Sequence, residues 1–310
     1  MSVVWVTGAK GFIGRHLSTY LAAEGLTVSG LGHGALPPEL LSQQGLTHWI
    51  NGDIDAHNLQ QLFRCTGFPD VIYHLAGGSS VGLSLQTPAE DFRRSVVSTA
   101  ALLEWVRIAN PKIKIVVSSS AAVYGSIGLK RIPEIGQFTP YSPYGFHKRT
   151  AELICESYAQ NFGLKIAVVR LFSVYGPGLC KQLLWDLCCR LMRMPDFLEL
   201  HGTGAEIRDW LYVADAVKLL VAVSELEPLE FLLLNGATGI GTSVRDVAIL
   251  MCKAMGVAPE VKFSGHKRPG DPFSLVGDTT RLQEALSIQL DYSLNLGLAE
   301  YAKWFKQFRN

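Results

Sequence analysis

Short apolar runs alternate with longer amphipathic stretches through the first half of the chain. Five runs rich in β-branched residues have the length and boundaries of buried strands: Val3–Thr7, Leu26–Leu31, Val71–Leu75, Ile113–Ser118 and Ile166–Arg170. Apolar residues recur at helical spacing in four segments between them: Gly11–Glu24, Asn58–Arg64, Ala89–Ile108 and Pro143–Asn161. Strands that alternate with helices predict parallel βαβ units, so we expect a doubly wound α/β fold with a parallel sheet.

The pattern changes after Arg170. Turns rich in glycine and proline separate three helical stretches, at Lys181–Met192, Val213–Ser224 and Ser243–Met255. We therefore expect a first domain over residues 1–170 and a smaller C-terminal lobe over residues 171–310. No linker separates the two, and the strand-like Phe231–Leu234 could return to the main sheet, so we expect the lobes to be partly interleaved.

Composition limits the class of protein. Of the 310 residues, 48% are hydrophobic and only 18% are charged, which excludes a disordered chain. The formal net charge of +1 provides no overall field for nucleic acid or an anionic membrane, so an anionic ligand must meet locally placed cations. No apolar run reaches the length of a membrane span and the first residues do not form a signal peptide, so we expect a cytoplasmic protein.

The six cysteines include no Cys-x-x-Cys pair and lie mostly in apolar, helix-like segments. Free buried thiols are therefore predicted, rather than disulfides or metal ligands, at Cys65, Cys155, Cys180, Cys188, Cys189 and Cys252. We expect no metal site.

A glycine-rich turn follows the first predicted strand and opens the first predicted helix. Backbone N–H groups and the positive end of the helix dipole at such a turn suit a pyrophosphate, which predicts a Rossmann-type dinucleotide site. The glycines are spaced as Gly-x-x-Gly-x-x-Gly rather than Gly-x-Gly-x-x-Gly, so a merely tight turn is the alternative. The candidate cofactor-binding residues of the loop are Gly8, Lys10, Gly11, Phe12, Ile13 and Gly14.

The end of the second predicted strand bears on the choice between NAD and NADP. An acidic residue there would bind the adenosine ribose and select NAD, but the position is Gly32. The missing acid favours NADP, and the basic side chains available to its 2′-phosphate are Lys10, Arg15 and His33. Asp53 and Ile54 would lie along the adenine edge, although Asp53 could equally be an ordinary turn residue.

Ser142-Pro143-Tyr144 has the pattern of a helix start, with a serine N-cap followed by proline. Tyr144 and Lys148 then lie four residues apart on one face of that helix. A nearby ammonium stabilises a phenolate, so we expect Lys148 to lower the pKa of Tyr144 from its reference value of about 10. Ser120 ends a predicted strand at the edge where open α/β sheets bind ligands, and its hydroxyl could hold a substrate oxygen. The alternative is a surface Tyr/Lys pair beside serines that merely end a strand.

Several motifs occur in the order typical of one large enzyme family. They are Thr7–Gly14, His74–Gly77, Ser118–Gly125, Ser142–Tyr144 with Lys148, Arg170–Gly178, Arg208–Val213 with Asp215, and Arg268–Asp271. On these motifs, which cover nearly the whole chain, the sequence resembles an extended short-chain dehydrogenase/reductase of the nucleotide-sugar epimerase, dehydratase and ketoreductase group.

The resemblance implies roles for individual residues. Tyr144 would be the acid/base, Lys148 its electrostatic partner and the anchor of the nicotinamide ribose, and Ser120 the hydroxyl that holds the reacting sugar oxygen. Further cofactor contacts are implied at Leu75, Ala76, Gly77 and Phe172, and substrate contacts at Ser79, Ser120, Ser173, Arg208 and Arg268. The two arginines would clamp a diphosphate, because a guanidinium binds phosphate at two points. The resemblance also implies a homodimer formed through the helices predicted at 89–108 and 143–161.

The sequence departs from the family pattern in a few places. Dehydratases of the group carry an Asp-Glu pair where this chain has Ala121 and Ala122, so we do not expect a dehydratase. Ser95 and Ser173 stand where asparagine is common, which changes the groups available to the substrate, although serine keeps one donor and two acceptor lone pairs.

With these departures, the resemblance implies hydride transfer at a ring carbon, C4, of a nucleoside-diphosphate sugar. The missing ribose acid favours a 4-keto-sugar reductase that consumes NADPH. The alternative is a 4-epimerase that retains NAD and recovers its hydride. A noncatalytic dinucleotide sensor is a further alternative, and the intact Ser120, Tyr144 and Lys148 set argues against it.

Overall fold

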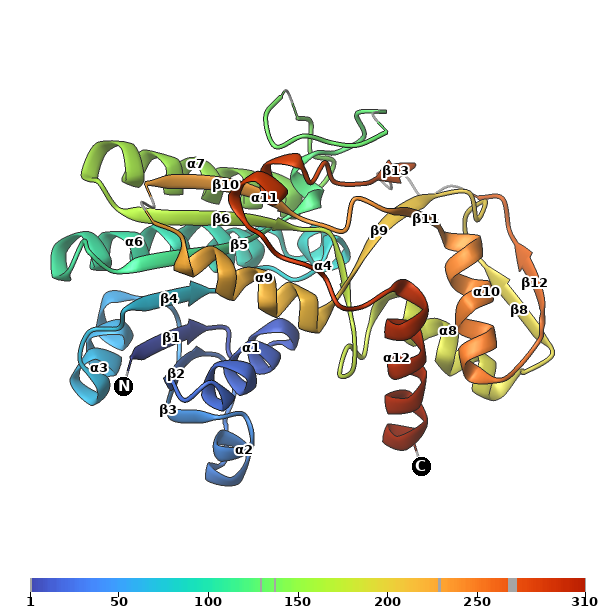
Figure 1. The fold of residues 1–310 in the computed structure, drawn as a ribbon, viewed down its shortest axis with the longest axis horizontal. Helices are drawn as coiled ribbons and strands as arrows, with labels where there is room; N and C mark the ends of the chain where they lie inside the picture. Colours follow the sequence, from blue (N-terminus) through green and yellow to red (C-terminus); the bar gives the residue numbers. More distant parts are fainter. Residues whose placement is uncertain (1, 129, 137, 228–229, 267–271, 310) are drawn as a thin grey trace. The chain divides into compact units, whose positions relative to one another are not determined.

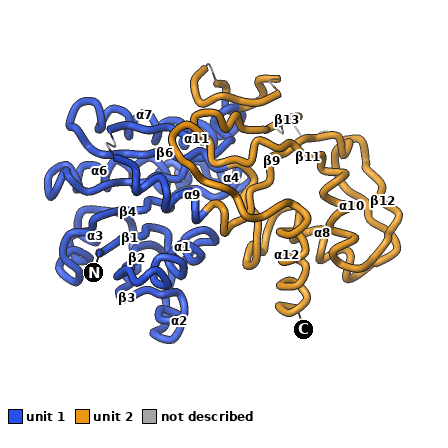
Figure 2. Tube along the Cα trace, in the orientation of Figure 1, with its two compact units in different colours: residues 1–124, 140–171, 217–234 blue, residues 125–139, 172–216, 235–310 orange. Residues whose placement is uncertain are grey.

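The computed structural model describes residues 2–128, 130–136, 138–227, 230–266 and 272–309. They form two compact units (Figure 2). The first unit comprises residues 1–124, 140–171 and 217–234, and the second comprises residues 125–139, 172–216 and 235–310. The chain thus passes from one unit to the other several times, and the division into domains 1–170 and 171–310 stays a prediction.

A seven-stranded sheet forms the centre of the first unit, in the order β10-β6-β5-β4-β1-β2-β3 (Figure 1). Its strands are β1 (Val3–Thr7), β2 (Thr27–Gly32), β3 (Leu46–Asn51), β4 (Val71–His74), β5 (Lys114–Ser120), β6 (Lys165–Leu171) and β10 (Phe231–Gly236). The pairs from β6 through β3 are all parallel, which confirms the predicted doubly wound, Rossmann-type α/β fold. The strand-like segment at residues 231–234 does return to this sheet, beside β6.

Helices cover both faces of the sheet. On one face, α3 (Ala56–Thr66), α6 (Ser98–Ala109) and α7 (Pro143–Phe162) share a core with alternate strand residues, such as Ile72 of β4. The next residue, Tyr73, faces the other way, and its hydroxyl lies 2.9 Å from Ser224 Oγ of α9 (Val213–Glu225). Further helices of this unit include α1 (Phe12–Ala23), α2 (Pro38–Gln43) and α4 (Val81–Gln86). A short 3-10 turn, η2 (Ala121–Val123), follows β5.

The helix expected over Ala89–Ile108 is not uniform. It consists of α5 (Pro88–Phe92), a π-helical turn η1 (Arg93–Val97) and then α6. Such turns are rare and occur frequently at functional sites. Hydrophobic periodicity does not reveal the change in hydrogen-bond pattern, because apolar residues continue on both sides of it.

The second unit is built from short strands and helices. Its strands are β7 (Ser173–Tyr175), β8 (Phe197–Leu200), β9 (Ile207–Tyr212), β11 (Gly241–Ser243), β12 (Glu260–Phe263) and β13 (Ser274–Leu275). β9 pairs with β7, β11 and β13, and β8 pairs with β12. Its helices are α8 (Gln182–Arg193), α10 (Val244–Met255), α11 (Thr280–Ala285) and α12 (Leu294–Arg309). α8 and α10 begin and end within one residue of the prediction, whereas α11 and α12 were not predicted.

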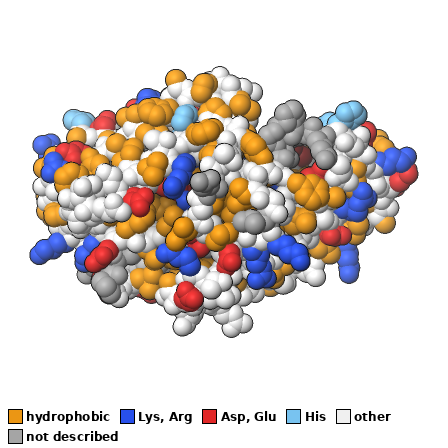
Figure 3. All heavy atoms as spheres, turned by 90° about the horizontal axis from the view of Figure 1, so that it is seen from above, with side chains coloured by type: hydrophobic (Ala, Val, Ile, Leu, Met, Phe, Trp, Pro, Cys, Tyr) orange, Lys and Arg blue, Asp and Glu red, His pale blue; other side chains and the backbone are white. Residues whose placement is uncertain are grey.

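Charged side chains of both signs are scattered among apolar ones on the surface in Figure 3, in keeping with the low charged fraction. Within the described ranges, no helix combines the length and the apolar character needed to cross a membrane. All six cysteines are free, as predicted. The prediction of burial is confirmed for Cys155, Cys188 and Cys252 but is wrong for Cys65 and Cys180, which are exposed.

Candidate active site

The glycine loop connects β1 to α1 and has no room for side chains at two positions. Gly8 has a φ of +70°, and a Cβ on it would lie 2.9 Å from the backbone nitrogen of Ala76. A Cβ on Gly14 would lie 2.2 Å from the Gly8 carbonyl oxygen. Gly11 is the N-cap residue of α1 and provides no side-chain cap, which leaves the first-turn N–H groups without an intrahelical acceptor. This helix N-terminus fits the pyrophosphate of a dinucleotide.

The end of β2 carries no acidic side chain, as the sequence shows. A Cβ on Gly32 would lie 3.3 Å from the ring of Trp49, so the indole fills the space beside this position. Lys10 reaches the loop that follows, where its Nζ donates to the Ala35 carbonyl at 3.0 Å. A Cβ on Gly34 would lie 2.5 Å from the same Nζ. Lys10 is one of the three residues predicted to contact a 2′-phosphate. Its side chain lies against the backbone of the loop that follows β2.

His33 and Asp53, both predicted near the adenosine, pair with each other. His33 Nε2 lies 2.9 Å from Asp53 Oδ1, and Arg93 Nη1 lies 2.5 Å from Asp53 Oδ2. Ile54 is buried beside them in the chain, with 7% of its surface exposed. His33 thus contacts the Asp53 carboxylate. This contact would compete with a contact between His33 and the 2′-phosphate of NADP.

Local capping fixes the start of α7 as the sequence predicts. Ser142 Oγ accepts the Gly145 N–H at 3.2 Å, and Pro143 occupies the first turn. The Tyr144 N–H is directed outside the helix, to Ser84 Oγ of α4 at 3.1 Å. The hydrogen bond from the Tyr144 N–H to Ser84 fixes the backbone that carries the tyrosine. No local sequence pattern indicates this contact.

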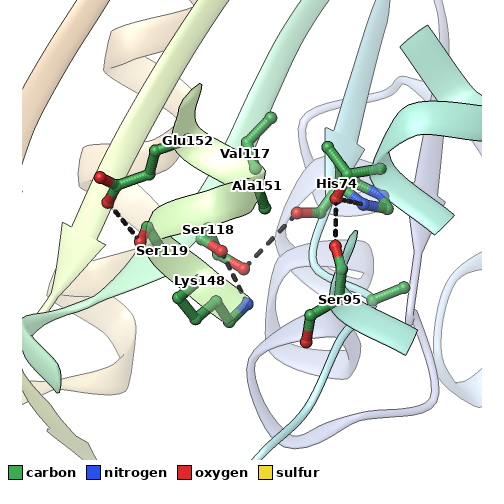
Figure 4. A pocket seen from close by; sticks show the side chains of 10 residues that line it. His74, Ser95, Val117, Ser118, Ser119, Lys148, Ala151 and Glu152 are labelled. Carbon is green, nitrogen blue, oxygen red and sulfur yellow. Dashed lines mark hydrogen bonds between the residues drawn. The ribbon is translucent and has the colours of Figure 1, made fainter. Parts of the chain in front are cut away.

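Lys148 is buried between two strand ends. Its Nζ donates to the Ser118 carbonyl of β5 at 3.0 Å (Figure 4). A Cβ on Gly77, in the loop after β4, would lie 3.0 Å from the same Nζ. Burial lowers the pKa of this ammonium to about 8, although the carboxylates of Asp91 and Glu152 act in the opposite direction. The structure thus brings Lys148 against the predicted cofactor segment Leu75-Ala76-Gly77.

The pKa of Tyr144 is raised rather than lowered. Burial is the main cause and the Asp91 carboxylate adds to it, whereas a hydrogen bond with Ser120 lowers the pKa. The ammonium of Lys148, which the spacing predicted as the stabilising charge, is directed to the Ser118 carbonyl instead. The predicted direction of the shift is therefore wrong for this structure, but Ser120 and Tyr144 do meet as expected. Ser120 Oγ also accepts the Ala122 N–H at 3.2 Å, which caps η2.

Sequence reasoning missed the buried polar groups that surround these residues. Glu152 accepts from Ser119 Oγ at 2.6 Å and from Arg170 Nε and Nη2 at 2.8 and 2.7 Å. Asp91 Oδ2 lies 2.6 Å from His147 Nδ1. One signal was available for Glu152, because it follows Lys148 by four residues and so lies on the same face of α7.

The remaining candidates are placed as follows. Ser79 follows the glycine pair after β4 and is exposed. In the second unit, Phe172 is buried and donates its N–H to the Gly236 carbonyl at 3.1 Å, and Ser173 lies opposite Trp210 in the β7–β9 pair. Arg208 lies on β9, where its Nη1 donates to the Ile207 carbonyl at 2.8 Å. Arg268 lies outside the described residues. In the part of the chain that the structure describes, no group of three or more His, Cys, Asp or Glu side chains could hold a metal ion.

Comparison with known proteins agrees with this geometry. The model of the NAD dependent epimerase/dehydratase family matches residues 4–229. A probable dTDP-glucose 4,6-dehydratase from Sinorhizobium fredii is 29% identical and aligns with 97% of this chain and 92% of its own. UDP-glucose 4-epimerase from Thermotoga maritima, solved with UDP-glucose, has a TM-score of 0.89 at 27% identity and covers 99% of this chain and 100% of that one. MoeE5, solved with UDP-glucuronic acid and NAD, has a TM-score of 0.87 at 30% identity with coverage of 99% and 100%. The chain therefore belongs to the NAD dependent epimerase/dehydratase family of enzymes, as its motifs predict.

Proposed function

We propose that this chain is an NAD-dependent 4-epimerase of a nucleoside-diphosphate sugar. The observation that carries the proposal is the hydrogen bond of Tyr144 with Ser120 at the carboxyl end of β5, where Lys148 Nζ also donates to the Ser118 carbonyl. The similar structures include a UDP-glucose 4-epimerase and a complex of UDP-glucuronic acid with NAD. They favour the epimerase over the 4-keto-sugar reductase that the missing ribose acid suggested, and over a noncatalytic sensor.

The residues after β5 argue against a dehydratase, although a probable dehydratase is among the relatives. Elimination of water needs an acid to protonate the leaving hydroxyl and a base to remove a carbon-bound proton. Ala121 and Ala122, the first two residues of η2, carry neither an acid nor a base. An epimerase needs only one group that removes and returns the hydroxyl proton, and Tyr144 can serve in both directions.

In this proposal the chain's own residues orient the sugar and move one proton. Tyr144 takes the proton of the sugar hydroxyl as the ring carbon is oxidised. It returns the proton after the keto sugar has rotated to present its opposite face. Ser120 holds the same oxygen, and its hydrogen bond also favours the phenolate of Tyr144, against the effect of burial. Lys148 adds positive charge beside the cofactor segment Leu75-Ala76-Gly77. NAD, when bound, would supply the acceptor and the donor of the hydride.

The loop Gly8–Gly14 and the segment 75–77 would hold the cofactor, with Phe172 as a further contact. We propose NAD, retained between turnovers, because an epimerase must return the same hydride. The preference for NADP that the sequence suggests depends on Lys10, which lies against the loop after β2. Lys10→Ala should lower the affinity for NADPH and leave that for NADH unchanged if this lysine contacts a 2′-phosphate.

The substrate would be bound by Ser79, Ser173, Arg208 and Arg268. An arginine suits a diphosphate, since its fork of N–H donors matches two phosphate oxygens. Arg208→Ala should raise KM for a UDP-sugar at least tenfold and change kcat little, and Arg245→Ala, at the start of α10, provides the control. An unchanged KM would contradict the proposed substrate class.

We also propose a homodimer formed through α6 and α7. Large apolar side chains remain exposed along these helices and the preceding turn, at Phe92, Val97, Ile108, Phe146, Leu153 and Phe162. Large exposed apolar patches are typical of an interface. This surface would also explain the small number of charged residues in the chain.

One experiment separates the candidate functions. The purified protein is denatured, the released nucleotide is identified, and the intact protein is incubated with UDP-glucose or UDP-glucuronic acid without added cofactor. Stoichiometric NAD and conversion to the 4-epimer support the proposal. An empty protein that oxidises NADPH only with a 4-keto sugar nucleotide would establish the reductase instead. Bound nucleotide without turnover of any sugar nucleotide would indicate a sensor.

A further inference from the structure

His74, the last residue of β4, is a buried histidine that the proposed chemistry does not use. Only 1% of its surface is exposed. Nδ1 lies 2.8 Å from Thr7 Oγ1, and Nε2 lies 3.1 Å from Thr99 Oγ1. The imidazole therefore connects the end of β1 with the first turn of α6, which begins directly after the π-helical turn η1.

The partners of His74 determine which ring nitrogen carries the hydrogen. Thr99 Oγ1 donates to the Ser95 carbonyl at 2.6 Å, because a carbonyl can only accept. Thr99 must then accept from the imidazole, which places the hydrogen on Nε2. Nδ1 becomes the acceptor, and Thr7 Oγ1 donates to it while accepting the Ala76 N–H at 3.3 Å. The hydrogen bonds therefore all run in one direction, from the Ala76 N–H through Thr7, His74 and Thr99 to the Ser95 carbonyl. Every group in this hydrogen-bonded series has a partner.

One end of this hydrogen-bonded series supports the dinucleotide loop. Thr7 immediately precedes the loop, and a Cβ on Gly8 would lie 2.9 Å from the Ala76 nitrogen and 3.0 Å from the Leu75 carbonyl carbon. The backbones of the two strand ends are therefore in close contact at the point that Thr7 and His74 hold together.

The other end supports the surroundings of Lys148. Ser95, which accepts from Thr99 through its carbonyl, accepts the Gly78 N–H through its hydroxyl at 2.9 Å. Gly78 follows Gly77, where a Cβ would lie 3.0 Å from Lys148 Nζ. Figure 4 shows His74 and Ser95 across a small cavity from Ser118 and Lys148.

We propose that His74 is a positioning residue that couples the dinucleotide loop to the Lys148 side of the catalytic site through a fixed Nε2–H tautomer. Burial, together with the positive charge of Lys148, lowers the pKa of His74 to about 3, which keeps the ring neutral in the working range of an enzyme. The catalytic readout rests on the proposed function, whereas the tautomer and the nucleotide affinity can be measured without any sugar substrate.

The first test uses two valine variants that interrupt the hydrogen-bonded series on opposite sides of the His74 imidazole. Thr7→Val removes the donor to Nδ1 and should raise the Kd for NADH about tenfold, with a smaller effect on turnover at saturating cofactor. Thr99→Val removes the acceptor of the Nε2 hydrogen and should lower kcat for 4-epimerisation about tenfold, with little change in the Kd for NADH. A merely structural role would lower stability in both variants without this split.

The second test is independent of any variant. In the wild-type protein with ¹⁵N-labelled histidine, NMR should show one ring with a protonated Nε2 and an unprotonated Nδ1, unchanged between pH 8 and pH 5. Assignment uses His74→Asn, and His57→Asn, on the exposed face of α3, is the matched control. Asparagine keeps an acceptor toward Thr7 but is too short to reach Thr99, so His74→Asn should reproduce the kinetic defect of Thr99→Val more closely than that of Thr7→Val.

A hydrogen on Nδ1, a ring that titrates near pH 6.5, or equal changes in Kd and kcat in both valine variants would overturn the inference. If the wild-type protein binds NADH and shows the Nε2–H tautomer but converts no sugar nucleotide, the proposed function fails while the coupling of His74 to the dinucleotide loop stands.

Discussion

Glu152 and Arg170 form a buried two-point ion pair that joins α7 to β6. Arg170 Nε and Nη2 lie 2.8 and 2.7 Å from the two carboxylate oxygens of Glu152, and both residues are at most 2% exposed. Ser119 of β5 donates to the same carboxylate. The pair therefore fixes α7, with Tyr144 and Lys148, relative to the strand that ends in Ser120.

Removal of one member of this pair should destabilise the protein strongly. Glu152→Gln leaves the Arg170 guanidinium buried without its counter-charge, for which about 3–5 kcal/mol of unfolding free energy is expected. Urea titration followed by circular dichroism measures the loss. Glu104→Gln, which breaks the exposed pair of Glu104 with Arg107, should have little effect. Equal stabilities of the two variants would show that the buried pair does not hold α7.

Tyr144→Phe should lower kcat by about 10² to 10⁴, because the ring remains but the proton-transferring hydroxyl is lost. The Kd for NADH, measured by fluorescence, should stay the same. Tyr141→Phe removes a hydroxyl from an exposed residue three positions earlier and should leave kcat unchanged. Turnover by Tyr144→Phe at the wild-type rate would exclude the proposed role.

Stability should fall as the pH is lowered, and His74 should be one cause. Its folded-state pKa of about 3 is below its ordinary value of 6.5, so between these values the unfolded chain binds a proton that the folded chain does not. The free energy of unfolding contributed by this group is complete above pH 6.5 and declines by up to about 1.4 kcal/mol per pH unit as the pH falls toward 3. The difference in stability between wild type and His74→Asn should therefore narrow between pH 7 and pH 5. A constant difference would mean that His74 titrates normally in the folded protein.

A single charge on the exposed face of α7 should separate the proposed dimer. Leu153 is 49% exposed, and Leu153→Lys would place an ammonium within the interface. Size-exclusion chromatography with light scattering should give a dimer for wild type and a monomer for this variant. Leu296→Lys, at a similarly exposed leucine of α12, is the control and should remain dimeric. A monomeric wild type would exclude the homodimer.

Local signals predicted those parts of the molecule that local interactions determine. β1 has the predicted bounds, and α7 begins at the predicted Pro143, because a buried β-branched run and a serine–proline cap are local features. α12 also has a serine cap, because Ser293 Oγ accepts the Leu296 N–H at 3.3 Å, but no proline follows that serine. It is stabilised by packing with α8, where the rings of Trp185 and Phe305 lie 5.2 Å apart, and that contact joins residues 120 positions apart in sequence.

The site shows the same division between local and tertiary determinants. The spacing of Tyr144 and Lys148 predicted that they share a helix face, but it could not predict the direction of the Lys148 amine or the burial that raises the pKa of Tyr144. The buried partners Asp91, Thr99 and Glu152 were missed because each acts through a side chain distant in sequence. Such polar contacts depend on the register of helices against strands, which periodicity does not report.

The π-helical turn η1 has a geometric consequence for these buried groups. In an α-helix, each step of four residues overshoots a full turn by about 40°, so three side chains spaced four residues apart spread around the axis. The wider turn at Arg93–Val97 reverses part of this drift, and Asp91, Ser95 and Thr99 all remain buried. One helix can thereby keep a straight row of polar groups toward His147, Gly78 and His74, while Phe92 and Val97 stay exposed on its outer side.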